Sequence, residues 1–189
     1  MVLEGAARVF SEHGVRDATV DQILVTSRIS RRTFYRFYES KEAVMVALYH
    51  VGTQLLIEGC RAAMSSEGGP LRRLVGCMEM HLTHARASGR LMFVLGGEAQ
   101  RHESLLFPRR METHDVIARL LTAEFDALFE KAVDPWFARA LIFSMEGTTR
   151  LALQECDEGR SVTDDSLDRA RQVMIRIASA ILGQGEGSR

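Results

Sequence analysis

The sequence predicts an all-α protein, and three observations support this prediction. Apolar residues recur at spacings of three and four along nearly the whole chain of 189 residues. The period-two alternation of β-branched residues that marks half-buried strands is scarce. Residues that favour helix starts recur between the apolar stretches. We therefore expect two domains: a helix-turn-helix head of three helices at residues 1–45, and a larger helical body at residues 46–189.

The first predicted helix carries an apolar stripe and ends at His13-Gly14, where glycine can adopt a left-handed conformation. The stripe consists of Val2, Ala6, Val9 and Phe10.

Hydroxyl residues then mark three further helix starts. Thr19 precedes Gln22 by three residues, which is the spacing of a capping box. A serine side chain at each of the next two starts can accept a bond from an orphan backbone N–H. We expect the second, third and fourth helices to follow Thr19, Ser30 and Ser40 and to end near Thr26, Tyr38 and Met64.

The body begins after a linker of small and polar residues, Ser65–Gly69. Proline suits the first turn of a helix because its missing N–H would be unpaired there, and Pro70, Pro108 and Pro135 each follow a loop-like stretch. These signals predict body helices near residues 70–87, 90–99, 108–131, 135–156 and 164–183.

Charge is distributed unevenly along the chain. The formal net charge is −1, but the segment Arg28–Lys41 carries five basic residues and one acid, a net +4, which leaves −5 on the remainder. A short basic stretch on an otherwise acidic protein is typical of a surface that contacts phosphate.

The third predicted helix divides into a cationic and an aromatic side. At 100° per residue, Arg31, Tyr35, Arg32 and Arg36 cover an arc of about 140°. We expect the aromatic residues on the other side, Phe34, Phe37 and Tyr38, to hold the helix to the head. Arginine can bind guanine edges bidentately while neighbouring groups bind phosphates, so this helix fits a major groove. At the starts of the second and fourth helices, Thr19 and Lys41 could add phosphate contacts near the helix N-termini.

These motifs together resemble the DNA-binding head of the TetR family of bacterial regulators. The resemblance covers about a quarter of the chain and rests on VLEGAARVF at 2–10, Gly14, ATVDQI at 18–23 and ISRRTFYRFYESKE at 29–42. It implies a nine-helix homodimer that binds a palindromic operator on double-stranded DNA and releases it when a small-molecule effector binds. It also implies DNA contacts from positions matching Thr19, Arg31, Arg32, Thr33, Tyr35 and Lys41.

The chain departs from the family pattern in several places. The turn between the second and third helices has Ser27-Arg28 where the family usually has Ala-Gly, so either the turn is differently shaped or Arg28 adds a phosphate contact. Leu24, Arg32 and Phe37 replace the usual Ala, Gly and His, and the last change removes one expected phosphate contact. Because the sequence begins almost inside the first helix, we expect no minor-groove contacts from a basic N-terminal arm.

The body offers apolar stripes and adaptable side chains. Two late helices carry wide stripes that suit a dimer interface or, equally, the protein's own core: Phe137, Leu141, Ile142, Met145, Leu151 and Leu153, then Leu167, Val173, Met174, Ile177 and Ile181. Methionine and aromatic residues make adaptable pocket walls, although they also fill cores. The candidates to line an effector pocket are Met78, His81, Met92, Phe93, Met111, His114, Trp136 and Phe143.

Several classes of protein are disfavoured. No apolar stretch in the sequence approaches the roughly 18 residues of a membrane span, so we expect a cytoplasmic protein without membrane contact. The three cysteines are widely spaced and indicate buried thiols rather than a disulfide framework or zinc site. Neither a metal nor a cofactor is expected, because the five-residue set His81, His84, Glu98, His102 and His114 matches no known ligand spacing.

The prediction is therefore a sequence-specific transcriptional regulator, a repressor released by an effector, and not an enzyme. Two alternatives stay open. One is a helical-bundle enzyme with carboxylate-bound metals, although the chain contains no Glu-x-x-His pair. The other is an interaction module that kept the head but lost DNA binding.

Overall fold

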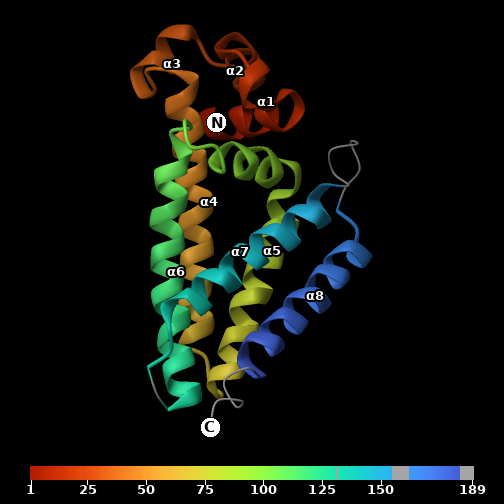
Figure 1. Ribbon diagram of the computed structural model, residues 1–189. Helices are drawn as coiled ribbons and strands as arrows, with labels where there is room; N and C mark the ends of the chain where they lie inside the picture. Colours follow the sequence, from red (N-terminus) through yellow and green to blue (C-terminus); the bar gives the residue numbers. More distant parts are fainter. Residues whose placement is uncertain (131, 155–161, 184–189) are drawn as a thin grey trace. The chain divides into compact units, whose positions relative to one another are not determined.

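The computed structural model describes residues 1–130, 132–154 and 162–183, and all regular structure in this part of the chain is helical. The elements in order are α1 (Val2–Asp17), α2 (Val20–Ser27), α3 (Arg31–Phe37), α4 (Lys41–Met64), α5 (Pro70–Ala99), α6 (Leu106–Phe129), α7 (Pro135–Gln154) and α8 (Asp164–Gly183) (Figure 1). The all-α prediction is confirmed.

The chain divides into two compact units, each with its own apolar core. The first unit combines Met1–Gln54 with Arg90–Met111, and the second combines Leu55–Gly89 with Glu112–Arg189. Helices α4, α5 and α6 each contribute residues to both units.

The caps predicted for the head are confirmed. Thr19 and Gln22 form the full capping box of α2: the Gln22 N–H donates to Thr19 Oγ1 over 3.2 Å, and the Thr19 N–H donates to Gln22 Oε1 over 2.8 Å. Ser30 Oγ accepts from the Thr33 N–H, and Ser40 Oγ accepts from the Ala43 N–H, both over 3.1 Å. Each cap satisfies an N–H that the helix itself leaves unpaired.

Glycines interrupt two of the helices. Gly14 has φ 74° and breaks the regular geometry of α1 at the predicted place, although α1 resumes and continues to Asp17. The two helices predicted on either side of residue 89 are one element, α5, with Gly89 at φ 49° and ψ −126°. Glycine tolerates such positive φ values because it has no Cβ.

Helix α6 begins at Leu106, two residues before the predicted Pro108. Ser104 Oγ accepts from the Leu106 N–H over 3.2 Å and so caps the helix earlier. Pro108 lies within the first turn, where its missing N–H costs nothing.

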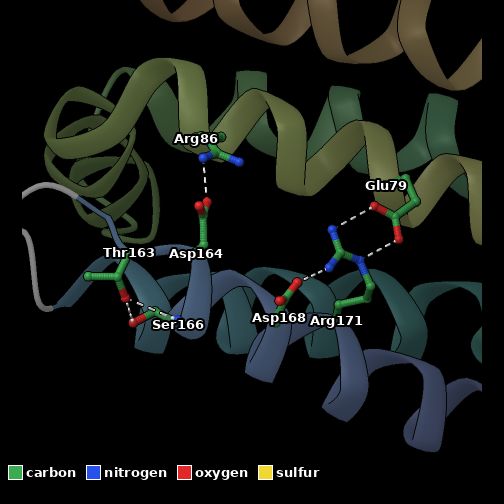
Figure 2. Close-up of polar contacts among 7 residues, drawn as sticks. All are labelled: Glu79, Arg86, Thr163, Asp164, Ser166, Asp168 and Arg171. Atoms are coloured by element: carbon green, nitrogen blue, oxygen red, sulfur yellow. Dashed lines mark hydrogen bonds and ion pairs between the residues drawn. The ribbon is translucent and has the colours of Figure 1, made fainter.

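In the second unit, α7 and α8 lie side by side (Figure 1) and α8 is also joined to α5 by ion pairs (Figure 2). Arg171 binds both oxygens of Glu79, Nε to Oε1 over 2.6 Å and Nη2 to Oε2 over 3.1 Å, and it also contacts Asp168. Arg86 pairs with Asp164 at the start of α8. The planar guanidinium suits such a bidentate contact, which fixes the register of α8 against α5.

The apolar stripes of α7 and α8 contribute to the core only in part. Leu141, Ile142, Met145 and Leu153 of α7 are buried, as are Leu167 and Met174 of α8. Phe137, Leu151 and Val173 from the same predicted stripes are exposed on this chain, and the side chain of Ile181 lies outside the described residues.

Candidate nucleic-acid interface and a polar cluster in the second unit

Helix α3 presents a basic and aromatic surface from a single buried anchor. Phe34 is fully buried in the core of the first unit, and Tyr38 packs against that core from the end of the helix. Arg31, Arg32, Tyr35 and Arg36 are all exposed. This part of the prediction is confirmed, because the predicted cationic arc of α3 is exposed at the surface.

The prediction that Phe37 anchors α3 is wrong. Its side chain is 60 % exposed, and the Arg36 guanidinium lies over its ring, 4.7 Å from the ring centroid. Phe34 and Tyr38 pack against the core at this short helix, so Phe37 adds an apolar surface beside the arginines. Arginine over an aromatic face is a favourable cation–π arrangement.

Arg31 is held by an acid that the sequence analysis did not single out. Its guanidinium forms an ion pair with Asp21 in the first turn of α2, and both side chains are more than half exposed. An exposed pair of this kind contributes at most about 1 kcal/mol. Arg31 is therefore oriented by α2 yet remains available to a stronger anionic partner.

Lys41 does not project freely from the start of α4, as its predicted phosphate contact would require. Its Nζ donates to the carbonyls of Val15 and Arg16 over 2.9 Å and to that of Ala18 over 2.7 Å. An ammonium group has three N–H donors, so none remains for a phosphate in this arrangement. Lys41 instead ties α4 to the carboxyl end of α1, where a cation is also favoured by the helix dipole.

The turn between α2 and α3 keeps the shape that a glycine would favour. Arg28 has φ 54° and ψ 43°, the left-handed region. Its N–H bonds to the Val25 carbonyl over 3.2 Å, and the Ile29 N–H bonds to the Leu24 carbonyl over 3.1 Å, which together form a Schellman motif. The Arg28 side chain is exposed, three residues before the start of α3.

Ser27 and Gly5 explain how α1 and α2 approach one another. A Cβ added to Gly5 would lie 2.0 Å from Ser27 Oγ, so residue 5 has room only for a hydrogen. Ser27 Oγ is buried and has no hydrogen-bond partner. The close contact thus leaves one polar atom unsatisfied at the base of the turn.

The hydroxyls of the remaining predicted contact residues serve the caps. Thr19 Oγ1 lies 3.0 Å from Gln22 Oε1, and Thr33 Oγ1 lies 2.9 Å from Ser30 Oγ. Thr19 stands at the start of α2, and Thr33 lies in the first turn of α3.

The eight predicted effector residues divide between the two units. Met92, Phe93 and Met111 belong to the first unit, and the other five belong to the second. Met78 is buried in the core of the second unit. Trp136 is 77 % exposed and Phe143 is also exposed, so on this chain Trp136 is a surface residue and not part of an interior wall.

Buried polar groups from α5, α6 and α7 meet in the second unit. His114 Nε2 lies 2.7 Å from Glu146 Oε1, and the His114 ring packs edge-on against Phe143 with 5.1 Å between centroids. Burial lowers the pKa of His81 to about 4, with Glu146 opposing and His84 and His114 adding to the shift. His81 is therefore a neutral imidazole at pH 7.

Two atoms of this region have no partner. His81 Nε2 and Thr149 Oγ1 are both buried without a hydrogen bond. Thr149 follows Glu146 by three residues, which places both on one face of α7. We call His81, His114, Glu146 and Thr149 the polar cluster. Sequence analysis found the two histidines but gave no signal for Glu146 or Thr149, which resemble ordinary helix residues.

Two further results concern metals and membranes. Among the described residues, no group of three or more His, Cys, Asp or Glu could hold a metal ion. The prediction that no apolar stretch approaches the length of a membrane span is wrong, because helix α4 is long and apolar enough to cross a membrane by length and composition alone. This is weak evidence, because a core helix of a soluble protein passes the same test.

Comparison with known proteins agrees with this geometry. Residues 2–48 match the family model for bacterial regulatory proteins of the tetR family. No curated protein sequence matches the chain.

Solved structures share the fold over nearly the whole chain. The fatty acid degradation regulator FadR from Bacillus halodurans superposes with a TM-score of 0.78 at 17 % identity, covering 100 % of this chain and 98 % of that one. FadR from Bacillus subtilis, solved in complex with stearoyl-CoA, gives 0.77 at 17 % identity, with 94 % and 96 % covered. The ketosteroid regulator KstR2 of Mycobacterium tuberculosis gives 0.71 at 22 % identity, with 97 % and 92 % covered.

The family match decides between the alternatives left open by the sequence, because TetR-family proteins are non-enzymatic DNA-binding regulators. The match includes the whole of α1, α2 and α3 with their caps and the exposed basic arc. The head of the chain therefore matches the tetR family of bacterial regulatory proteins, and the protein is a DNA-binding transcriptional regulator.

Proposed function

We propose that the protein is a homodimeric cytoplasmic repressor that binds a palindromic operator through α3 and leaves it when a small molecule binds the body. The observation that carries the DNA-binding part is the exposed arc of α3 above the buried ring of Phe34. In this proposal residues 1–45 bind DNA, and residues 46–189 bind the effector and the second subunit.

The residues of the arc have different roles in the proposed complex. Arg31 and Arg32 read base edges, because a guanidinium can bind guanine bidentately. Arg28, Arg36 and Tyr35 bind phosphates and fix the register, with the hydroxyls of Thr19 and Thr33 at the helix starts. Lys41 supports the surface indirectly, since its ammonium is bonded to backbone carbonyls.

To test this assignment, the purified protein is first used to select the genomic DNA fragments that it binds. The affinities of the variants for a selected duplex are then measured. Arg32→Ala should cost about 1 to 3 kcal/mol on the selected duplex and relax base preference at one position. Arg36→Ala should weaken all duplexes alike and reduce the slope of log K against log salt by about 1. Equal effects of both variants on every sequence would refute the division into base and phosphate contacts.

An exposed stripe on α7 supports the dimer. Trp136, Ala140, Phe143, Gly147 and Leu151 recur at helical spacing within an arc of about 80°, and all five are exposed on the single chain. Leu151 is 69 % exposed, and Gly147 has open space where a Cβ would stand. Large apolar residues with small ones between them suit close packing against a second helix. Leu151→Glu should give a monomer by light scattering, and an unchanged dimer would exclude this stripe as the interface.

The polar cluster supports an effector with an apolar body and a carbonyl oxygen. His81 Nε2 and Thr149 Oγ1 lack partners inside an otherwise apolar core, and a buried unpaired polar atom costs about 1 to 3 kcal/mol. A ligand carbonyl could accept a bond from either group. The Glu146 carboxylate would repel a free acid. Among the structural relatives, one is a fatty acid degradation regulator, a second was solved in complex with stearoyl-CoA, and a third is a ketosteroid regulator.

Stearoyl-CoA is therefore the first probe for release of the selected duplex, with stearate and free coenzyme A as controls. We expect the thioester to lower DNA affinity and the free acid to act more weakly. Thr149→Val keeps the shape of the side chain and should weaken the response without altering DNA affinity in the absence of probe. A response that Thr149→Val and His81→Phe leave unchanged would place the effector elsewhere.

A further inference from the structure

We propose that Cys60 and Cys77 are a modification site, at which a peroxide oxidises the two thiols to a disulfide between α4 and α5. Both sulfurs belong to the second unit, and their Sγ atoms lie 2.7 Å apart. A disulfide needs about 2.05 Å, so the bond requires a closure of well under 1 Å. The sequence analysis had excluded a disulfide framework because the cysteines are far apart along the chain.

Small residues bring the two helices close together at this point. A Cβ on Gly76 would lie 3.2 Å from the Ala63 Cβ, and a Cβ on Gly59 would lie 2.6 Å from Met80 Cε. Gly59 thus faces Met80, Cys60 faces Cys77, and Ala63 faces Gly76. Residue numbers rise along α4 as those of their partners fall along α5, so the two helices are antiparallel here. The two helices are therefore held close together on both sides of the thiols.

The hydrogen bond between the thiols gives them different roles. The Cys77 S–H donates to Cys60 Sγ. This bond lowers the pKa of Cys60, against the effect of burial, and it raises the pKa of Cys77 together with burial. Cys60 is therefore the thiolate that reacts first, since the thiolate is the nucleophile, and Cys77 is the resolving thiol.

The reaction balances with hydrogen peroxide as the oxidant. The Cys60 thiolate attacks one peroxide oxygen, the O–O bond breaks, and hydroxide leaves, so Cys60 becomes a sulfenic acid. Cys77 sulfur then attacks the Cys60 sulfur, forming the S–S bond as the S–O bond breaks. The Cys77 proton leaves with the hydroxyl of the sulfenic acid as one water. A solvent proton converts the hydroxide released from the peroxide into a second water. Two thiols are oxidised by two electrons, and one peroxide is reduced.

Burial limits which oxidants can react. Both side chains are at most 1 % exposed, so a small neutral molecule is required, whereas bulky thiol reagents should react slowly. The two cysteines are 17 positions apart in the chain, and the resulting loop closes on helices that are already packed. This inference concerns the thiols alone and stands whether or not the proposed effector is correct.

Mass spectrometry of the full-length chain tests the proposal in a Cys156→Ser background, which removes the third thiol. Millimolar hydrogen peroxide should lower the mass by 2 Da, and digestion should recover a Cys60–Cys77 peptide pair that dithiothreitol separates. With Cys77→Ala, Cys60 should be trapped as a sulfenic acid, a mass gain of 16 Da. Dimedone added as the chain is unfolded in urea should then label Cys60 at least tenfold more than in the parent.

The matched control is Cys60→Ala, in which Cys77 should stay reduced and unlabelled. Two free thiols after peroxide treatment that fully oxidises a control peptide would overturn the proposal. So would sulfinic acid on Cys60, a mass gain of 32 Da, without any linked peptide. Circular dichroism of each alanine variant separates a change in reactivity from loss of the fold.

Discussion

The turn between α2 and α3 predicts an unusual gain in stability from replacing Ser27 with Ala and Arg28 with Gly. Arg28 is held at φ 54°, a conformation that costs a residue with a Cβ about 1 to 2 kcal/mol. Glycine removes that cost but gains freedom in the unfolded chain worth about 0.4 to 1 kcal/mol. The net gain expected from Arg28→Gly is about 0.5 to 1 kcal/mol.

Ser27→Ala adds a second gain. Its hydroxyl is buried without a partner, and such a group costs about 1 to 3 kcal/mol, from which the lost packing of one oxygen must be subtracted. We expect about 0.5 to 1.5 kcal/mol. The double variant should therefore gain about 1 to 2.5 kcal/mol, although adjacent sites can couple and the cycle of single variants must be measured.

Urea unfolding followed by circular dichroism measures these gains as a higher midpoint at unchanged slope. Arg28→Ala is the matched control, since alanine loses the guanidinium but keeps the Cβ, and it should gain nothing. If Arg28→Gly and Arg28→Ala have the same stability, backbone conformation is not the cause. DNA binding should weaken in both variants and lose about one unit of salt slope, because the proposed phosphate contact is gone.

Three further predictions concern charged groups. Lys41→Met removes three charge-assisted bonds to the end of α1 and should lower the free energy of unfolding in urea by about 2 to 4 kcal/mol. Lys41→Arg should recover part of this loss. If Lys41→Met leaves the free energy of unfolding unchanged, these bonds are not formed in solution. Asp21→Asn frees Arg31 and should raise affinity for DNA a few-fold at low salt, and a decrease would mean that the ion pair orients Arg31 for binding. His81 has a folded pKa of about 4, below its unfolded value of about 6.5, so stability is full above pH 6.5 and falls as pH drops towards 4. The loss from pH 7.5 to 5 should be about 2 kcal/mol, and His81→Leu should lose less over the same interval; identical profiles would refute a buried neutral His81.

The local features of the head could be predicted from sequence because they depend on residues only a few positions apart. The capping box of Thr19 and Gln22, the Ser30 and Ser40 caps and the break at Gly14 all involve neighbouring residues, and each is present. Phe37 shows the limit of this approach. Helical periodicity predicted the side of α3 on which Phe37 lies. It could not show that no other element of the head covers that side, so that Phe37 is exposed.

Long-range contacts were beyond sequence reasoning for a physical reason. Lys41 could have bound either a phosphate or a carbonyl, and only the position of the α1 carboxyl end, about 25 residues earlier, selects the carbonyls. Cys60 and Cys77 likewise meet only because glycines at neighbouring positions let α4 and α5 approach closely. No local pattern encodes such distances.

The sequence by itself determined the helical class, the caps of the head, the basic arc of α3 and the match of the head to a DNA-binding family, since periodicity, capping and motif order are properties of neighbouring residues. The tertiary structure decided which side chains remain free to act. In the folded chain the Lys41 ammonium is hydrogen-bonded to the end of α1, and Phe37 is exposed. His81 Nε2 and Thr149 Oγ1 are buried without partners, and the thiols of Cys60 and Cys77 are in contact. Each of these outcomes depends on desolvation and distance between segments far apart in the chain, which only the packed fold sets.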